Sequence, residues 1–282
     1  MGVSTLMTSR VLSGSLALLL TGTCCAARKP GDPVKPGFNV YSKQMDVDLG
    51  RQASAEIEKQ VEVVNDPTLQ NYISDLGRRL SRHDRAGGYP YTFKLVNVDS
   101  INAFALPGGP VYVHTGLVLA AEIEAQLAGV LAHEIGHVAL RHATNQASKA
   151  NLLSLPAALA AAVIGQGSAA AEAGQVGLGL GVNTVLLKYS RDAESQSDAF
   201  GARLMSDAGY NPLEMAVFFE KLQEQGGSRA PQFLSSHPNP GNRVEAVQAE
   251  IRTFPQRSYG SGTGQLNDMK QRIRRLPPGK VK

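Results

Sequence analysis

The stretch His133-Glu134-Ile135-Gly136-His137 constrains this chain more than any other. Two histidines four positions apart on a helix lie on the same face, so both imidazoles can reach one metal ion. Glu134 points away from the line that joins the two rings, which leaves its carboxylate free to act as general base toward a metal-bound water. The alternative is a pair of partly buried histidines that bind no metal.

The residues around this motif predict a helix. Residues 122–132 and 138–142 place apolar side chains at core-facing positions, and no proline interrupts them. One class of zinc peptidase takes a third histidine six positions after the second, but Ala143 stands there. His142 is one position short of it and points to another face, so we expect it to contact a ligand or support the structure.

A catalytic zinc needs a third protein ligand and an open fourth position. Glu194 and Asp198 lie one turn apart in a predicted helix, so they share a face. Glu194 could bind the metal, while Asp198 could accept a hydrogen bond from the outer nitrogen of either motif histidine. The residues alone leave open that both are ordinary solvated carboxylates.

The first 27 residues predict an export signal. Arg10 is their only charged side chain, the apolar run from Val11 to Leu20 is too short to span a bilayer comfortably, and small residues precede position 28. The alternative is a lipoprotein anchored through Cys24 or Cys25. Since these are the chain's two cysteines, a cleaved protein would have no disulfide and no cysteine nucleophile.

Composition and charge divide the rest of the chain into three parts. Hydrophobic residues make up 43% and charged residues 18% of the chain, which is typical of a globular protein, and the lack of Trp argues against a nucleic-acid partner. We expect a Pro/Gly leader at 28–39, one catalytic domain at 40–254 and a flexible tail at 255–282. Within the domain, residues 150–187 are apolar and predict a packed hairpin or a flap, with a membrane span as the less favoured alternative. The tail carries seven Lys or Arg against one Asp, so either of these two segments could contact a membrane surface.

The periodicity of apolar residues gives a coarse order of elements. It predicts helices at Ser42–Val63, Asp66–Arg82, Ser190–Asp207, Asn211–Gln225 and Arg243–Arg252, strands at Tyr89–Val98, Ile101–Leu106 and Pro110–His114, and a loop at Ser235–Pro240.

Several ordered motifs over roughly residues 40–250 resemble the CAAX-prenyl-protease-like family of zinc peptidases, in its exported bacterial branch. The motifs are Ile101–Gly109, Val111–Leu117, the metal motif with Arg141-His142, Tyr189-Ser190-Arg191 with Glu194 and Asp198, and His237-Pro238 with Arg243. The resemblance implies an α+β, mainly α, gluzincin-type fold. It also implies a small sheet whose edge strand borders the active-site cleft.

The resemblance also assigns roles to individual residues. It implies one zinc ion per chain, with Glu194 as third ligand beside His133 and His137. His237 and Arg243 match the family's active-site histidine and arginine, which could donate to the oxyanion, and His237 could also cap the metal in a resting enzyme.

The stretch Asn102-Ala103-Phe104 resembles the edge strand above the zinc, to which an extended peptide would add through backbone hydrogen bonds. We therefore expect a periplasmic zinc endopeptidase that acts on unfolded or misassembled envelope proteins. Two alternatives remain: a non-degrading chaperone on the same fold, and a membrane-associated protease that trims membrane substrates.

Overall fold

The computed structural model describes residues 28–151, 188–224, 232–260 and 262–279. The predicted export signal and residues 152–187, nearly all of the apolar segment, lie outside the described residues. Within the described ranges, no helix combines the length and apolar character needed to cross a bilayer.

The strands form one mixed sheet of three in the order β1-β3-β2. Strand β3 (Pro110–His114) is central, pairing in parallel with β1 (Thr92–Val96) and antiparallel with β2 (Ala103–Ala105). In the turn between β2 and β3, Gly108 has φ +77°, and a Cβ there would lie 2.4 Å from the Val47 Cα of the first helix. Glycine therefore serves both the turn and the contact. The predicted edge position of β2 is confirmed.

Three of the described helices begin at a residue whose side chain caps them. The helices are α1 (Lys43–Gln60), α2 (Pro67–Ser81), η1 (Asp84–Ala86), α3 (Thr115–Ala120), α4 (Glu124–Ala139), α8 (Arg191–Asp207), α9 (Leu213–Glu224), α10 (Gln232–Ser236), α11 (Arg243–Ile251) and α12 (Leu266–Ile273), and residues 142–151 are helical as well. The side chains of Ser42, Asp66 and Ser190 accept hydrogen bonds from the first turns of α1, α2 and α8. Of these elements, η1, α3, α10 and α12 were not predicted.

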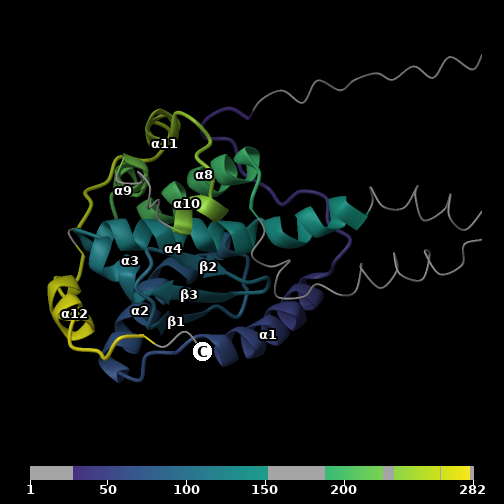
Figure 1. Ribbon diagram of the computed structural model, residues 1–282. Coiled ribbons are helices and arrows are strands. Elements are labelled where there is room, and N and C mark those ends of the chain that lie inside the picture. The colour runs from purple at the N-terminus through teal and green to yellow at the C-terminus, as the bar shows by residue number, and fades with distance from the viewer. Residues whose placement is uncertain (1–27, 152–187, 225–231, 261, 280–282) are drawn as a thin grey trace, which may run out of the picture.

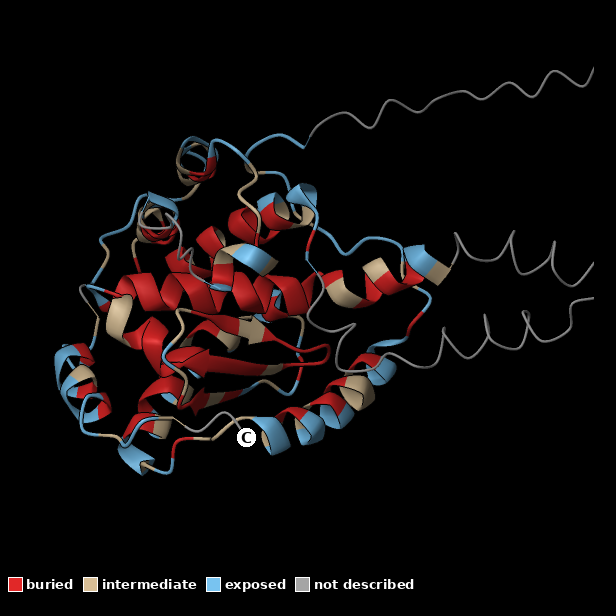
Figure 2. Ribbon diagram, viewed as in Figure 1, coloured by how far each residue is buried: buried red, intermediate tan, exposed pale blue. Residues whose placement is uncertain are grey.

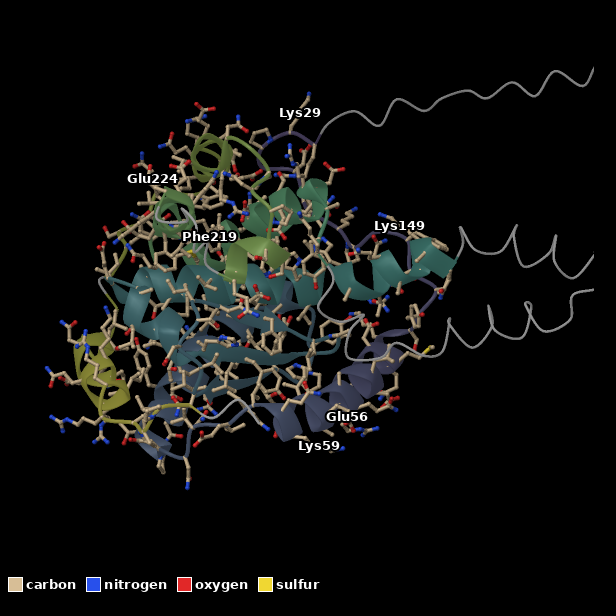
Figure 3. The ribbon with its side chains drawn as sticks, in the orientation of Figure 1. Lys29, Glu56, Lys59, Lys149, Phe219 and Glu224 are labelled. Carbon is tan, nitrogen blue, oxygen red and sulfur yellow. The ribbon has the colours of Figure 1, made fainter. Side chains whose placement is uncertain are left out.

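Helix α4 lies in the middle of the molecule, between the sheet and the group α8 to α11 (Figure 1). Every one of its residues is buried, and Figure 2 shows the same burial along its whole length. The labelled charged side chains Lys29, Glu56 and Lys149 lie at the periphery, whereas Phe219 of α9 lies inside (Figure 3). The metal motif on α4 is therefore held in the core.

Two glycines allow α4 and α8 to pack closely. A Cβ at Gly136 would lie 2.6 Å from the Ser197 hydroxyl of α8, and a Cβ at Gly201 would lie 3.1 Å from the backbone nitrogen of His133. Side chains at either position would push the helices apart. The Ser197 hydroxyl uses this proximity to donate a hydrogen bond of 2.6 Å to the His133 carbonyl.

The first residue of α4, Glu124, is a buried carboxylate held by distant parts of the chain. It accepts hydrogen bonds from Tyr72 at 3.2 Å, from Tyr210 at 2.7 Å and from the backbone N–H of Thr263 at 3.0 Å. The Thr263 hydroxyl donates to it as well. The C-terminal segment is therefore tied to the start of the central helix.

The terminal segments are more ordered than the sequence suggests. The flexible tail expected at 255–282 is wrong for α12, because Leu266, Met269 and Ile273 are buried in the main core. Burying one apolar side chain contributes about 1.5–3 kcal/mol to stability. The burial of these three therefore holds α12 on the core, although basic residues surround it. The leader has no helix or strand, but Arg28 forms an ion pair with Glu250 of α11.

Candidate metal centre

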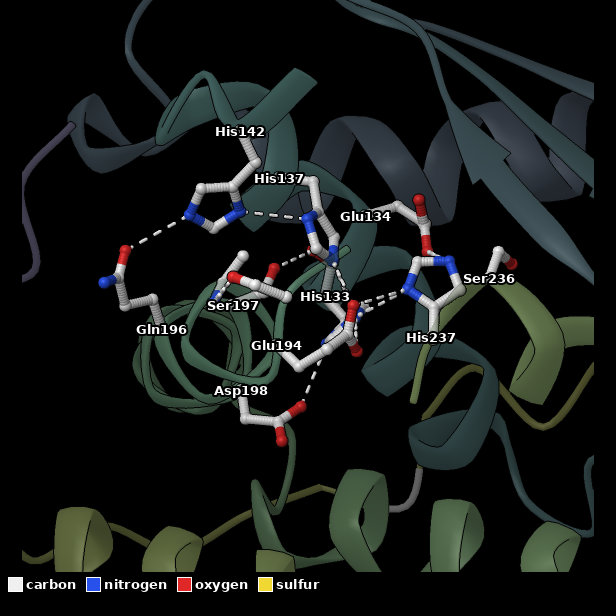
Figure 4. Close-up of polar contacts among 12 residues, drawn as sticks. His133, Glu134, His137, His142, Glu194, Gln196, Ser197, Asp198, Ser236 and His237 are labelled. Carbon is white, nitrogen blue, oxygen red and sulfur yellow. Dashed lines mark hydrogen bonds and ion pairs between the residues drawn. The ribbon is translucent and has the colours of Figure 1, made fainter. Parts of the chain in front are cut away.

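The two motif histidines and Glu194 meet at one point in the core (Figure 4). The Nε2 atoms of His133 and His137 lie 2.9 Å apart. Helix α8 brings Glu194 Oε2 to 3.3 Å from His133 Nε2 and Glu194 Oε1 to 3.4 Å from His137 Nε2. All three side chains are at most 2% exposed. This arrangement matches the expected ligand set.

His237, one residue after α10, joins this group as a fourth donor. Its Nδ1 lies 3.1 Å from Glu194 Oε1 and 3.3 Å from His133 Nε2. Tetrahedral zinc with bonds of about 2.0–2.1 Å requires donor atoms about 3.3 Å apart. The observed separations of 2.9 to 3.4 Å therefore fit one zinc ion with two to three histidines and a carboxylate.

Burial and the neighbouring charges set the protonation of this cluster. Burial alone would lower the pKa of His133, but the carboxylates of Glu194 and Asp198 raise it to about 9. Burial lowers the pKa of His137 well below its usual value. Burial opposes ionisation of Glu194, yet His237 and His133 hold the pKa of that carboxyl well below its ordinary range. The site thus keeps an anionic ligand beside a neutral imidazole.

A chain of polar contacts supports the cluster from the α8 and α11 side. The Nδ1 atom of His133 lies 2.9 Å from Asp198 Oδ1, the contact expected from the sequence. Arg243 donates from Nε to the other oxygen of Asp198 at 2.6 Å and from its NH2 group to Glu194 at 3.3 Å. Its guanidinium also lies 4.4 Å from the ring centre of Phe219. Arg243 is 2% exposed, and it faces two carboxylates.

Glu134 faces the opposite side of the metal group, toward a cleft of about 210 Å³. Burial raises the pKa of this carboxyl. Its Oε1 makes no hydrogen bond within the described part of the chain, although His237 Nε2 lies 3.4 Å away. Buried polar atoms are normally paired. An unpaired carboxylate oxygen next to a metal group is therefore a candidate acceptor for a proton.

The predicted substrate-binding stretch divides between the cleft and the core. Asn102 and Phe104 line the cleft with Glu134 and His237, whereas the side chain of Ala103 is completely buried and takes no part in the lining. The side-chain oxygen of Asn102 has no hydrogen-bond partner among the described residues. Ala103 could therefore contact a bound peptide only through its backbone.

The comparison with known families covers this whole assembly. The model of peptidase family M48 matches residues 66–251, which include the four donors, Glu134 and Arg243. The chain belongs to peptidase family M48. Its fold is therefore zincin-type, mainly helical with a small mixed sheet, as the resemblance implied.

The chain is similar to several bacterial proteases. It is 36% identical to a beta-barrel assembly-enhancing protease of Escherichia coli over 188 residues, 64% of this chain and 39% of that protein. It is 29% identical to the protein of that name from Yersinia pestis, over 86% of this chain and 51% of that one. The metalloprotease YcaL of Escherichia coli is 28% identical over 77% of this chain and 86% of that protein. The chain thus spans about half or less of the beta-barrel assembly-enhancing proteases.

Sequence reasoning missed several side chains around this M48 site. The Tyr189 ring stacks on His137, with ring centres 3.9 Å apart, and Phe233 stacks on His237 at 4.3 Å. His142, given only a general supporting part, contacts His137 directly at 2.9 Å. Tyr189 stood in a quoted motif but carried no assigned role. The sequence holds no signal that would pair Phe233 with a histidine four residues away on a loop.

Proposed function

We propose that this M48 peptidase is an exported zinc endopeptidase that hydrolyses peptide bonds of unfolded or misassembled proteins of the cell envelope. The observation that carries the proposal is the buried four-donor group lying directly beside Glu134, whose Oε1 makes no hydrogen bond among the described residues. The names of two relatives, which describe enhanced assembly of beta-barrels, support a role in envelope protein quality control.

Zinc is the proposed metal, held by His133, His137 and Glu194. Two neutral imidazoles and one carboxylate with a further open position are a usual catalytic zinc set. When bound, zinc supplies Lewis-acid chemistry: it makes a water nucleophilic near neutral pH and polarises the scissile carbonyl.

In this proposal Glu134 is the general base. Its unpaired Oε1 is positioned to take a proton from the attacking water, and burial, which raises the pKa of this carboxyl, strengthens it as a proton acceptor. The same carboxyl then returns the proton to the leaving amine. No other carboxylate lines the cleft among its described residues.

The edge strand β2 is the proposed substrate guide. It is only three residues long and pairs on one side with β3, so an extended peptide could continue the sheet on its other side. Asn102 adds an amide whose oxygen is unpaired. This mode of binding uses the substrate backbone, which favours extended, unfolded segments over a particular sequence.

His237 defines a closed resting state in this proposal. Because its Nδ1 completes the donor set, it fills the position that a water or a substrate carbonyl needs. We propose that it withdraws before catalysis. A site that opens only for clients would restrain proteolysis in the envelope.

The structure favours a positioning role for Arg243 over the oxyanion donor suggested by the resemblance. Its guanidinium binds Asp198 and Glu194, and it is absent from the lining of the cleft. We propose that it fixes the third ligand. The remaining candidate for an oxyanion donor from that pair is His237 once it has moved.

Location completes the proposal. The predicted signal at residues 1–27 would deliver the chain to the periplasm, either free or anchored through Cys24 or Cys25. Analysis of the mature N-terminus by mass spectrometry separates the two, because only an anchored form carries acyl chains.

Cleavage of casein by the zinc-loaded chain, beside Glu134→Gln, tests the enzymatic role. We expect fragments from the unmodified protein and a loss of at least about 100-fold in the variant, the range typical of general-base catalysis. Both proteins should bind one zinc, because Glu134 is not a ligand. Equal cleavage by both would reject the assigned base. Zinc binding without cleavage by either would favour a latent site capped by His237 or the chaperone alternative.

A further inference from the structure

His137 has a different kind of support from His133. Behind His133 stand a carboxylate and a guanidinium, Asp198 and Arg243. Behind His137 stands His142, whose Nδ1 lies 2.9 Å from the Nδ1 of His137. The other nitrogen of His142 lies 3.2 Å from the side-chain oxygen of Gln196 on α8 (Figure 4).

The protons of the hydrogen bonds from His137 through His142 to Gln196 can be placed in one consistent way. The Nε2 atom of His137 faces the other metal donors and must be free of a proton to bind zinc. Its Nδ1 therefore carries the proton and donates to His142. His142 in turn carries its proton on Nε2, which donates to the Gln196 oxygen. Every link then has one donor and one acceptor, from the metal group to α8.

We infer that His142 and Gln196 are positioning residues for zinc, forming a neutral hydrogen-bond chain that fixes the ring and tautomer of His137. This inference rests on the proposed function, because it requires a metal at the histidines. Partners of this kind raise the basicity of a ligand, and losing one typically weakens metal binding by about 10- to 100-fold.

The hydrogen-bond chain behind His133 is charged, whereas the chain behind His137 is neutral. A substitution can therefore change the strength of the support for His137. His142 is 6% exposed, and it starts the helix at residues 142–151, while Gln196 belongs to α8, which also carries Glu194 and Asp198. A carboxylate in place of the Gln196 amide would be a stronger acceptor for the His142 proton. His142 would then attract the His137 proton more strongly, and His137 would hold zinc more tightly.

Zinc dissociation constants, measured by competition with a coloured chelator, test the inference. We expect weakening of about 10- to 100-fold for His142→Phe, which removes the acceptor. His142→Gln keeps a side-chain oxygen and should recover part of the affinity. Gln196→Glu should bind zinc more tightly than the unmodified chain. His114→Phe is the matched control, since His114 is a buried histidine at 5% exposure that bonds to Ser100 and to no zinc ligand.

Two further measurements separate positioning from general stability. The melting temperature of the zinc-free protein should be similar in His142→Phe and the His114→Phe control, whereas only His142→Phe should bind zinc weakly. With cobalt in place of zinc, the visible spectrum should change in the His142 and Gln196 variants. Zinc affinity within twofold of normal in His142→Phe, or no tightening in Gln196→Glu, would overturn the inference. Failure of the unmodified chain to bind zinc would instead remove the proposed function itself.

Discussion

Arg243 and Asp198 form a buried ion pair, with 2.6 Å between the arginine Nε and the aspartate Oδ2. The other aspartate oxygen contacts His133, and the same guanidinium reaches Glu194. One arginine thus supports two proposed metal ligands, one directly and one through a carboxylate.

Arg243→Lys keeps the positive charge but loses the planar fork that serves two carboxylates. We expect zinc affinity to fall about tenfold or more, and cleavage of casein at limiting zinc to fall with it. Arg252→Lys, an exposed change just past the end of α11, is the control. Equal zinc affinity in the two variants would show that the fork is dispensable.

His237→Ala tests the closed resting state. Three ligands remain, so we expect the variant to keep one zinc with weaker affinity and to cleave casein severalfold faster than the unmodified chain at saturating zinc. The measurement is the initial rate, corrected for bound zinc. A slower rate at full zinc occupancy would mean that His237 assists the reaction, for example by stabilising the oxyanion.

Gly136→Ala tests the spacing of α4 and α8. The new methyl group would lie 2.6 Å from the Ser197 hydroxyl and 3.2 Å from its carbonyl oxygen, so the helices must separate. We expect a loss of about 1–3 kcal/mol in the free energy of unfolding, the range for overpacked cores. Zinc affinity should fall too, because Glu194 moves away with α8. In a helix with open space at this position, the same change would raise the free energy of unfolding by about 1 kcal/mol. A higher free energy of unfolding in urea denaturation would therefore contradict the close packing.

Acid should destabilise the fold through His114. Burial lowers the pKa of this histidine to about 4, against an ordinary value of 6.5. The stabilising contribution is complete above pH 6.5 and is lost as the pH falls toward 4, because the unfolded chain takes up the proton first. One pKa unit corresponds to about 1.4 kcal/mol, so the total approaches about 3 kcal/mol.

His114→Gln removes this titrating group while keeping an acceptor for Ser100. Denaturation curves between pH 7.5 and 4.5 should show a steeper loss of stability for the unmodified chain than for the variant. Parallel pH profiles for the two proteins would show that His114 does not couple folding to protons.

Local signals predicted the parts of the fold that depend on neighbouring residues. Ser42, Asp66 and Ser190 cap the helices that they were expected to begin. The i, i+4 spacing of His133 and His137 places both rings on one side of α4. Each of these features follows from the geometry of a single helix.

Features that depend on distant segments could not be predicted in the same way. The contact of Arg243 with Asp198 joins two helices, and nothing local marks that arginine as buried. Helix α12 repeats Leu266, Met269 and Ile273 at helical spacing, but the surrounding basic residues suggested a solvated tail. Helix α3 lacks a side-chain cap and directly follows β3, so no boundary separated it from the strand.

The buried carboxylate of Glu124 has a consequence for how the enzyme is made. Its partners include Tyr210 and Thr263, and a buried charge left without its partners is strongly destabilising. A ribosome finishes the catalytic helix well before it reaches these residues, or the residues that supply Glu194 and His237. A nascent chain therefore carries the metal motif long before it carries the complete donor group, so the proposed protease could not act during most of its own synthesis.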